Sequence, residues 1–141
     1  MIEIIVSDII NTRINKVDNL LKNYSAYNEW WLIPTETLKD KENYFQFSPL
    51  PFVKIGLEED FYQPNRMLRF KYIKGPFRGI GQWQLEKSEN DSTKISYTIR
   101  IKPINSIFGL MAKTKLFKWK HSQDILNIMK KIEKKAAENK L

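Results

Sequence analysis

The stretch GIGQWQLEKSENDSTKISYTI, residues 79–99, decides the fold, because it places two alternating segments on either side of a polar turn. In the second segment the apolar side is formed by Thr93, Ile95, Tyr97, Ile99 and Ile101, with polar residues between them. Such alternation is typical of an antiparallel strand with one covered face. The first segment puts Trp83 and Leu85 on its apolar side. The stretch therefore predicts a β-hairpin that buries one face.

The hairpin belongs to a longer region of antiparallel strands, residues 33–103. Turn-forming residues interrupt this region at 39–43, 48–51, 63–65, 74–76 and 89–92, so that five or six strands are expected. In the strand before the hairpin, Leu68, Phe70 and Tyr72 share the apolar side. A sheet with one apolar face needs a cover, and the flanking segments can supply it.

Both flanking segments have helical patterns. Residues 2–10 predict a short β-branched strand buried on both faces, after which Asn11 or Thr12 can cap a helix. Residues 24–31 predict a second, shorter helical segment. Residues 105–139 predict one long helix whose apolar stripe runs through Ile107, Leu110, Met111, Phe117, Ile125, Ile128 and Ile132.

The length of 141 residues predicts a single domain spanning residues 1–141. The absence of cysteine excludes disulfides and thiolate metal sites, and a single histidine makes a zinc site improbable. We therefore expect no metal and no cofactor. The amino terminus lacks the pattern of a secretory signal, and no apolar run is long enough to span a bilayer. These features predict a cytoplasmic protein, able to lie peripherally on a membrane.

The net charge of +8 is concentrated near the carboxyl end, where residues 104–141 contain nine lysines and only three acidic residues. A basic helix of this kind can contact an anionic membrane surface or nucleic acid. Nucleic acid is the weaker alternative, because the aromatic residues face inward instead of alternating with the lysines. A lysine-rich face that is simply solvated is a further alternative. The oligomeric state has no signal in the sequence.

Two adjacent tryptophans, Trp30 and Trp31, stand in YSAYNEWWLIP, residues 24–34. Neighbouring side chains on a helix point about 100° apart, and on a strand they point to opposite faces. One flat core wall therefore cannot hold both rings. Either one ring lines a pocket while the other packs in the core, or both close one end of the sheet.

Four segments in this order resemble the START-like superfamily, also called SRPBCC, over nearly the whole chain. They are VDNLLKNYSAYNEWW (17–31), PNRMLRFKY (64–72), the hairpin segment 79–99 and HSQDILNIMKKIEKK (121–135). The superfamily includes polyketide cyclases and dehydratases, lipid-transfer domains and coenzyme Q-binding proteins. The resemblance implies an α+β helix-grip fold. In this fold a curved antiparallel sheet wraps around a long carboxy-terminal helix, two short helices follow the first strand, and a hydrophobic cavity lies between sheet and helix.

A helix-grip cavity would use inward-facing aromatic residues as its walls. The expected ligand-binding residues are Trp31, Glu59, Phe61, Phe70, Tyr72, Trp83, Tyr97, Phe117 and His121. Alternation along residues 53–61 turns Glu59 and Phe61 inward, unless a bulge at Gly56 turns Glu59 outward. His121 falls on the apolar stripe of the long helix, either as a structural histidine or as a general acid or base.

These observations favour binding of a hydrophobic small molecule such as a lipid, a quinone or an aromatic polyketide. The alternative is a cyclase or dehydratase type of enzyme, in which Glu59 or His121 acts as acid or base and a tyrosine hydroxyl polarises a carbonyl. Binding is preferred because alternation alone does not bring a set of catalytic groups together. A START-like fold can carry either function.

Overall fold

The computed structural model describes the backbone of residues 2–104 and 115–138, and the side chains of the second range from Lys118 onward. The elements are β1 (Ile2–Ile10), α1 (Ile14–Lys22), η1 (Tyr24–Glu29), β2 (Thr35–Glu36), β3 (Tyr44–Leu50), β4 (Val53–Gln63), β5 (Met67–Lys74), β6 (Phe77–Lys87), η2 (Glu89–Asp91), β7 (Thr93–Pro103) and α3 (Lys115–Glu138). Here η denotes a 3-10 helix. The described strands form one antiparallel sheet in the order β1-β7-β6-β5-β4-β3-β2.

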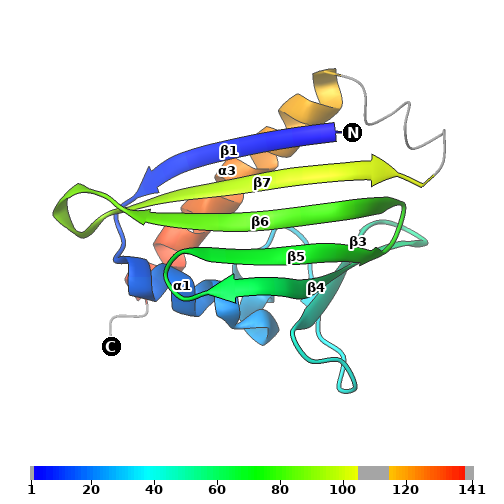
Figure 1. Ribbon diagram of the computed structural model, residues 1–141, viewed down its shortest axis with the longest axis horizontal. Helices are drawn as coiled ribbons and strands as arrows, with labels where there is room; N and C mark the ends of the chain where they lie inside the picture. Colours follow the sequence, from blue (N-terminus) through cyan, green and yellow to red (C-terminus); the bar gives the residue numbers. More distant parts are fainter. Residues whose placement is uncertain (1, 105–114, 139–141) are drawn as a thin grey trace.

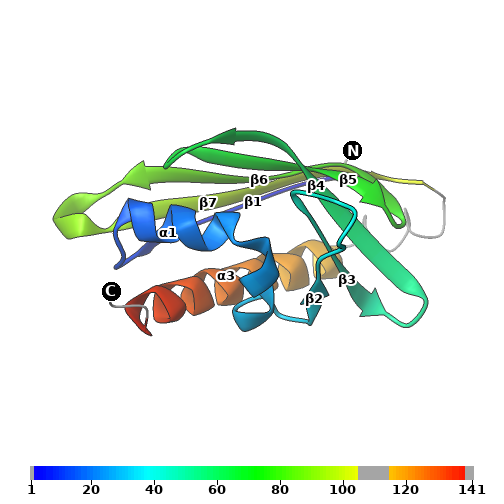
Figure 2. The ribbon, with the colours of Figure 1, turned by 90° about the horizontal axis from the view of Figure 1, so that it is seen from below.

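The hairpin predicted from residues 79–99 is confirmed as β6 and β7, with Trp83 opposite Tyr97 and Leu85 opposite Ile95. The six strands β2–β7 also agree with the five or six expected between residues 33 and 103. The sheet is long and curved (Figure 1). Helices α1 and α3 lie on the same side of it, with α3 running along the sheet (Figure 2). This arrangement is the predicted α+β helix-grip fold.

The core lies between the sheet and the two helices. Leu68, Phe70, Trp83, Leu85, Ile95 and Ile99 from the sheet pack with Val17 and Leu21 of α1 and with Ile125, Ile128, Met129 and Ile132 of α3. On α3 these residues recur at steps of three and four, which places them on one face of the helix. The apolar stripe predicted for the long helix is therefore buried from Ile125 onward. Its members Ile107, Leu110, Met111 and Phe117 lie outside the described side chains.

The prediction that residues 2–10 are buried on both faces is wrong. Ile4 and Val6 are buried, whereas Ile5 and Ile9 are 57% and 61% exposed. The reason is that the helices cover only one face of the sheet (Figure 2).

The predicted cap of α1 is also wrong. Arg13 occupies the N-cap position without a side-chain capping bond. Thr12 is buried instead, and its carbonyl oxygen accepts a hydrogen bond from the Thr93 hydroxyl at 2.6 Å. Packing against β7 thus sets the position of Thr12, in place of helix capping.

Strand β4 contains a bulge between Glu59 and Phe61, so that the two side chains lie on opposite faces of the sheet. Glu59 pairs with Phe70 and Phe61 pairs with Arg69, so Asp60 is an extra residue without a partner of its own. The alternation predicted for β4 therefore holds as far as Glu59, which points inward. It fails at Phe61, which lies on the outer face and is 43% exposed.

Candidate functional site

A pocket of about 240 Å³ lies between the sheet and the middle turns of α3. Its walls are mainly aromatic and aliphatic, with four polar side chains among them. The lining residues are Trp31, Leu32, Ile33, Phe47, Pro49, Tyr72, Trp83, Tyr97, Ile99, His121, Asp124, Ile125 and Ile128. Leu32 and Pro49 are exposed, so the surface side of the pocket lies at these two residues.

The two adjacent tryptophans have different surroundings. Trp30 is fully buried, and its ring centroid lies 4.2 Å from that of Tyr27 and 6.4 Å from that of Trp83. Trp31 is half-buried and lines the pocket, with its ring centroid 5.5 Å from that of Phe47. The first of the two alternatives for this pair is therefore the observed one: one ring packs in the core and the other forms a pocket wall.

Two tyrosines on the strands that flank β6 supply hydroxyl groups to the pocket. Tyr72 on β5 and Tyr97 on β7 are hydrogen-bonded to each other. Gly81 on β6 lies against both side chains. Burial raises the pKa of Tyr72 to about 12, although the hydrogen bond from Tyr97 opposes this rise. Burial also raises the pKa of Tyr97, and the neighbouring Tyr72 adds to the effect. Both hydroxyls are therefore protonated at neutral pH, and the pair can donate a hydrogen bond to a ligand.

Helix α3 contributes His121, Asp124, Ile125 and Ile128 to the pocket, at the spacing of three and four that keeps them on one face. Burial lowers the pKa of His121; Asp124 opposes this effect and Lys120 adds to it. The imidazole is therefore neutral at pH 7. The Asp124 carboxylate is ion-paired with Lys120 and accepts a hydrogen bond from its ammonium group at 2.8 Å.

The structure brings five of the nine predicted ligand-binding residues to the pocket: Trp31, Tyr72, Trp83, Tyr97 and His121. Phe70 is buried in the core, where its ring contacts those of Tyr24 and Phe45. Phe61 points away from the pocket because of the bulge in β4, which corrects its predicted inward position. The side chain of Phe117 lies outside the described residues.

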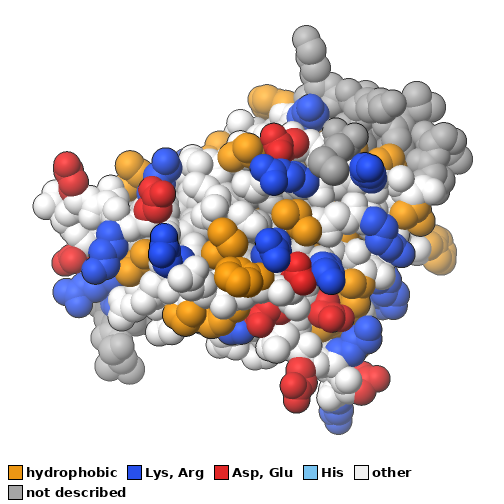
Figure 3. Space-filling view, in the orientation of Figure 1, with side chains coloured by type: hydrophobic (Ala, Val, Ile, Leu, Met, Phe, Trp, Pro, Cys, Tyr) orange, Lys and Arg blue, Asp and Glu red, His pale blue; other side chains and the backbone are white. Residues whose placement is uncertain are grey.

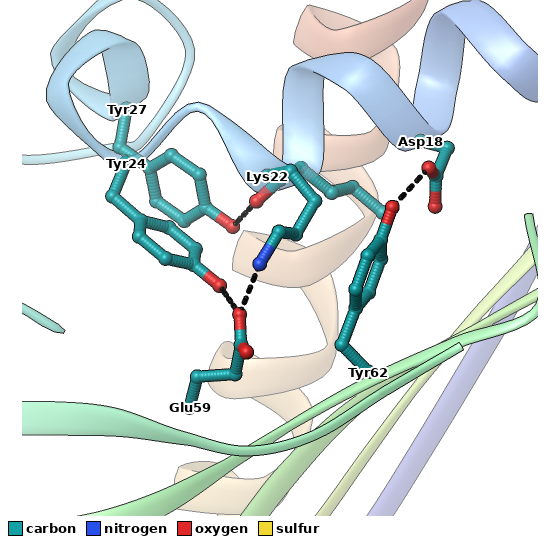
Figure 4. Close-up of polar contacts among 7 residues, drawn as sticks. Asp18, Lys22, Tyr24, Tyr27, Glu59 and Tyr62 are labelled. Atoms are coloured by element: carbon teal, nitrogen blue, oxygen red, sulfur yellow. Dashed lines mark hydrogen bonds and ion pairs between the residues drawn. The ribbon is translucent and has the colours of Figure 1, made fainter. Parts of the chain in front are cut away.

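Glu59 points inward but does not line the pocket. It accepts hydrogen bonds from the Tyr24 hydroxyl and the Lys22 ammonium group (Figure 4). The Lys22 ammonium also lies 4.2 Å from the ring centroid of Tyr62, whose hydroxyl donates to Asp18 at 2.6 Å. Glu59 therefore joins α1 and η1 to β4, away from the pocket.

Sequence reasoning missed several lining residues. Phe47 and Pro49 share one face of β3, a signal that alternation along residues 44–50 could have given. Asp124 follows His121 by three residues, so helical spacing could have found it. Leu32 and Ile33 lie between η1 and β2, where no periodic pattern exists.

Two buried indole N–H groups, those of Trp30 and Trp83, lack a hydrogen-bond partner among the described residues. Within the same part of the chain, no three His, Cys, Asp or Glu side chains are placed to hold a metal ion. No described helix is long and apolar enough to cross a membrane.

Several solved structures are similar in fold to this chain. No family model matches the sequence, and no curated protein matches it. A protein from Thermus thermophilus is similar in structure, with a TM-score of 0.79, 18% identity and 99% of both chains covered. The Zhui aromatase/cyclase from a Streptomyces species has a TM-score of 0.73 at 10% identity, with 96% of this chain and 93% of that chain covered. A START superfamily protein from Mycobacterium smegmatis has a TM-score of 0.73 at 9% identity, covering 98% and 99%.

These similarities extend over nearly the whole chain and include both a polyketide aromatase/cyclase and a START superfamily protein. The chain therefore has the START-like, SRPBCC-type helix-grip fold that the sequence predicts. In this chain a pocket lies between the sheet and the long helix.

Proposed function

We propose that this chain acts as a single START-like domain, residues 1–141, that binds a small, largely apolar molecule in the pocket. The observation that carries the proposal is the pocket itself: an apolar enclosure with a few convergent polar groups is the usual form of a small-molecule site. The walls are large aromatic rings, and the polar groups come from two strands and one helix.

The size and chemistry of the pocket narrow the ligand. An engineered apolar cavity of about 150 Å³ holds benzene, so by simple scaling a pocket of 240 Å³ holds roughly ten non-hydrogen atoms. The protonated hydroxyls of Tyr72 and Tyr97 favour a ligand with a hydrogen-bond acceptor such as a carbonyl. A quinone or another compact aromatic carbonyl compound fits these properties better than an extended lipid chain.

Native mass spectrometry of gently purified protein, compared with the denatured spectrum, tests for an apolar adduct that is lost on unfolding.

A second experiment measures the affinity of a defined probe, 1,4-naphthoquinone, by calorimetric titration. We expect Ile128→Phe to weaken binding at least tenfold, because the larger side chain fills space that the probe needs. The control is Ile5→Phe, which adds the same atoms at an exposed position on β1. Equal affinity of both variants and the wild type would contradict the proposed site.

An enzyme of the cyclase or dehydratase type is the second candidate function, favoured by the presence of His121 and Asp124 in the same pocket as the two tyrosines. A neutral imidazole can accept a proton from an acidic carbon while a tyrosine hydroxyl polarises the adjacent carbonyl. Glu59 has no such position, because it is paired with Lys22 and Tyr24. Screening of aromatic polyketide-like substrates, followed by His121→Ala, tests this function; turnover that His121→Ala leaves unchanged would exclude the proposed base.

Contact of the lysine-rich helix with an anionic membrane also stays a prediction. The lysines of residues 130–135 lie in the last turns of α3, near the labelled carboxyl end in Figure 2. One of them, Lys135, is paired with Glu29 at 2.9 Å, which reduces the charge available to a partner. Nucleic acid remains the less favoured partner.

A further inference from the structure

The β3–β4 hairpin ends in a strongly exposed apolar turn, residues 49–52, which we call the hairpin tip. Its sequence is PLPF, and Leu50 and Phe52 are 52% and 107% exposed. The tip continues from Pro49, which lines the pocket. These residues therefore carry exposed apolar surface immediately beside the surface side of the pocket.

Phe52 has a backbone conformation that is unusual for its residue type, with φ of 66°. The other described non-glycine residues with positive φ are Asn43, Asn65, Asn90 and Asp91, the types that tolerate this region. A bulky residue there strains the backbone, and full exposure means that Phe52 gains no core packing in return. Neither folding nor solubility explains a phenylalanine at this position, whereas contact with an apolar partner does.

The surroundings of the hairpin tip are basic. Hairpin residue Lys54 and its neighbour Lys74 on β5 lie close together, since the backbone of Lys54 adjoins Gly75 and Lys74 pairs with Gly56. Lys54 is paired with Glu36 of β2 at 3.3 Å, so Lys74 carries the excess positive charge of this group. The adjacent ends of β6 and β7 carry Arg78 and Lys102, which pair with each other in register. Segments 48–57, 72–80 and 98–104 contain no acidic residue. At the edge of the molecule beside the ends of β3 and β5, Figure 3 shows hydrophobic and basic side chains side by side.

We propose that the hairpin tip docks on an anionic lipid bilayer, with Phe52 and Leu50 inserted among the headgroups and the surrounding basic side chains facing anionic lipid. Apolar side chains inserted into the interface and a cationic surround are the two forces that hold peripheral proteins on such membranes. The biological role of this docking rests on the proposed function. Docking here would place the open side of the pocket against the bilayer, from which an apolar ligand could enter.

A second copy of the chain fits the hairpin tip less well. A stable protein interface buries about 800 Å² on each partner, more than a four-residue turn presents. Two basic surroundings would also repel each other. A bilayer needs only a few inserted side chains and supplies the opposite charge.

The experiment is co-sedimentation with vesicles of phosphatidylcholine alone and of phosphatidylcholine with one quarter phosphatidylserine. We expect the wild type to bind the anionic vesicles, and to bind less at high salt. Phe52→Asn should reduce partitioning about tenfold or more without loss of stability, because asparagine suits a positive φ. Leu50→Ser provides a second variant. The matched control is Phe61→Asn, an exposed phenylalanine near the other end of β4, which should bind like the wild type.

Three outcomes would overturn the proposal: no binding of the wild type to either vesicle, equal binding of Phe52→Asn and the wild type, or loss of binding only in a Lys131→Gln/Lys134→Gln variant. The last would assign docking to the lysine-rich helix. A dimer that Phe52→Asn abolishes, without vesicle binding, would make the tip an interface between copies. Phe52 is not a lining residue of the pocket, so Phe52→Asn should still bind 1,4-naphthoquinone. Vesicle binding without naphthoquinone binding would contradict the proposed ligand and leave docking intact.

Discussion

Gly81 illustrates how a single residue makes the pocket possible. A Cβ atom at this position would overlap the Tyr97 hydroxyl and would lie 3.5 Å from the Tyr72 ring. Only glycine leaves both rings where they are. The paired hydroxyls on either side of β6 therefore depend on a residue that has no side chain.

We expect Gly81→Ala to destabilise the protein by about 1–3 kcal/mol, because added volume in a packed core forces neighbours to shift. Urea unfolding monitored by circular dichroism measures this change. Tyr97→Phe removes the overlapping hydroxyl, so the double variant Gly81→Ala/Tyr97→Phe should be more stable than the sum of the single changes predicts. Strictly additive effects would show that the contact with the hydroxyl is not the source of the loss.

Side-chain direction could be predicted from the sequence only where the strands are regular. Alternation placed Tyr72, Trp83 and Tyr97 correctly, because β5, β6 and β7 keep their register through these residues. It misplaced Phe61, because an extra residue in β4 reverses the sides, and no residue type near Asp60 announces a bulge. The partners of Glu59 are 35 and 37 residues away in the sequence, so they follow from the fold alone.

At the scale of elements, a polar cluster joins α1 and η1 to the sheet (Figure 4). Glu59 on β4 accepts from Lys22 at the end of α1 and from Tyr24 at the start of η1. Asp18 on α1 accepts from the Tyr62 hydroxyl and, at 3.0 Å, from the backbone N–H of Asn65. These contacts therefore fix the position of α1 and η1, the elements that precede Trp30 and Trp31.

We predict that Glu59→Ala lowers the free energy of unfolding by about 2 kcal/mol, because it leaves a half-buried ammonium group and a tyrosine hydroxyl without their acceptor. The control is Glu58→Ala, whose side chain lies on the exposed face of β4 and should change stability by less than about 0.5 kcal/mol. Urea unfolding compares the two. Equal effects of both variants would mean that the cluster contributes nothing to the attachment of α1.

The order of the strands and helices could be predicted from the sequence better than their tertiary contacts. Turn residues and alternation gave the strands, and helical spacing gave α1 and α3, since both signals are local. Two features required knowledge of neighbours: β1 has an exposed face because the helices cover only one face of the sheet, and Thr12 packs on β7 instead of capping α1. At the candidate site, Leu32 and Ile33 could not be predicted, because tertiary packing alone brings a non-periodic segment to the pocket.

At the scale of the whole molecule, the tyrosines of the pocket, the polar cluster and the sheet share a raised pKa. All six tyrosines of the chain have a raised pKa. The largest cause in every case is burial, which disfavours the charged phenolate. The raised values reach about 12 for Tyr62 and Tyr72. In the unfolded chain these groups would titrate near pH 10.

This difference predicts alkaline unfolding. Because each pKa is higher in the folded state, the stabilisation is fully present below about pH 10 and is lost as the pH rises through the folded values. We expect the near-ultraviolet absorbance of tyrosinate to appear above pH 10 together with the loss of far-ultraviolet circular dichroism. In concentrated guanidinium chloride the same titration should show all six tyrosines with a midpoint near 10. A native protein in which several tyrosines ionise near that pH, with its circular dichroism unchanged, would contradict the burial of these rings, and with it the tyrosine-lined pocket.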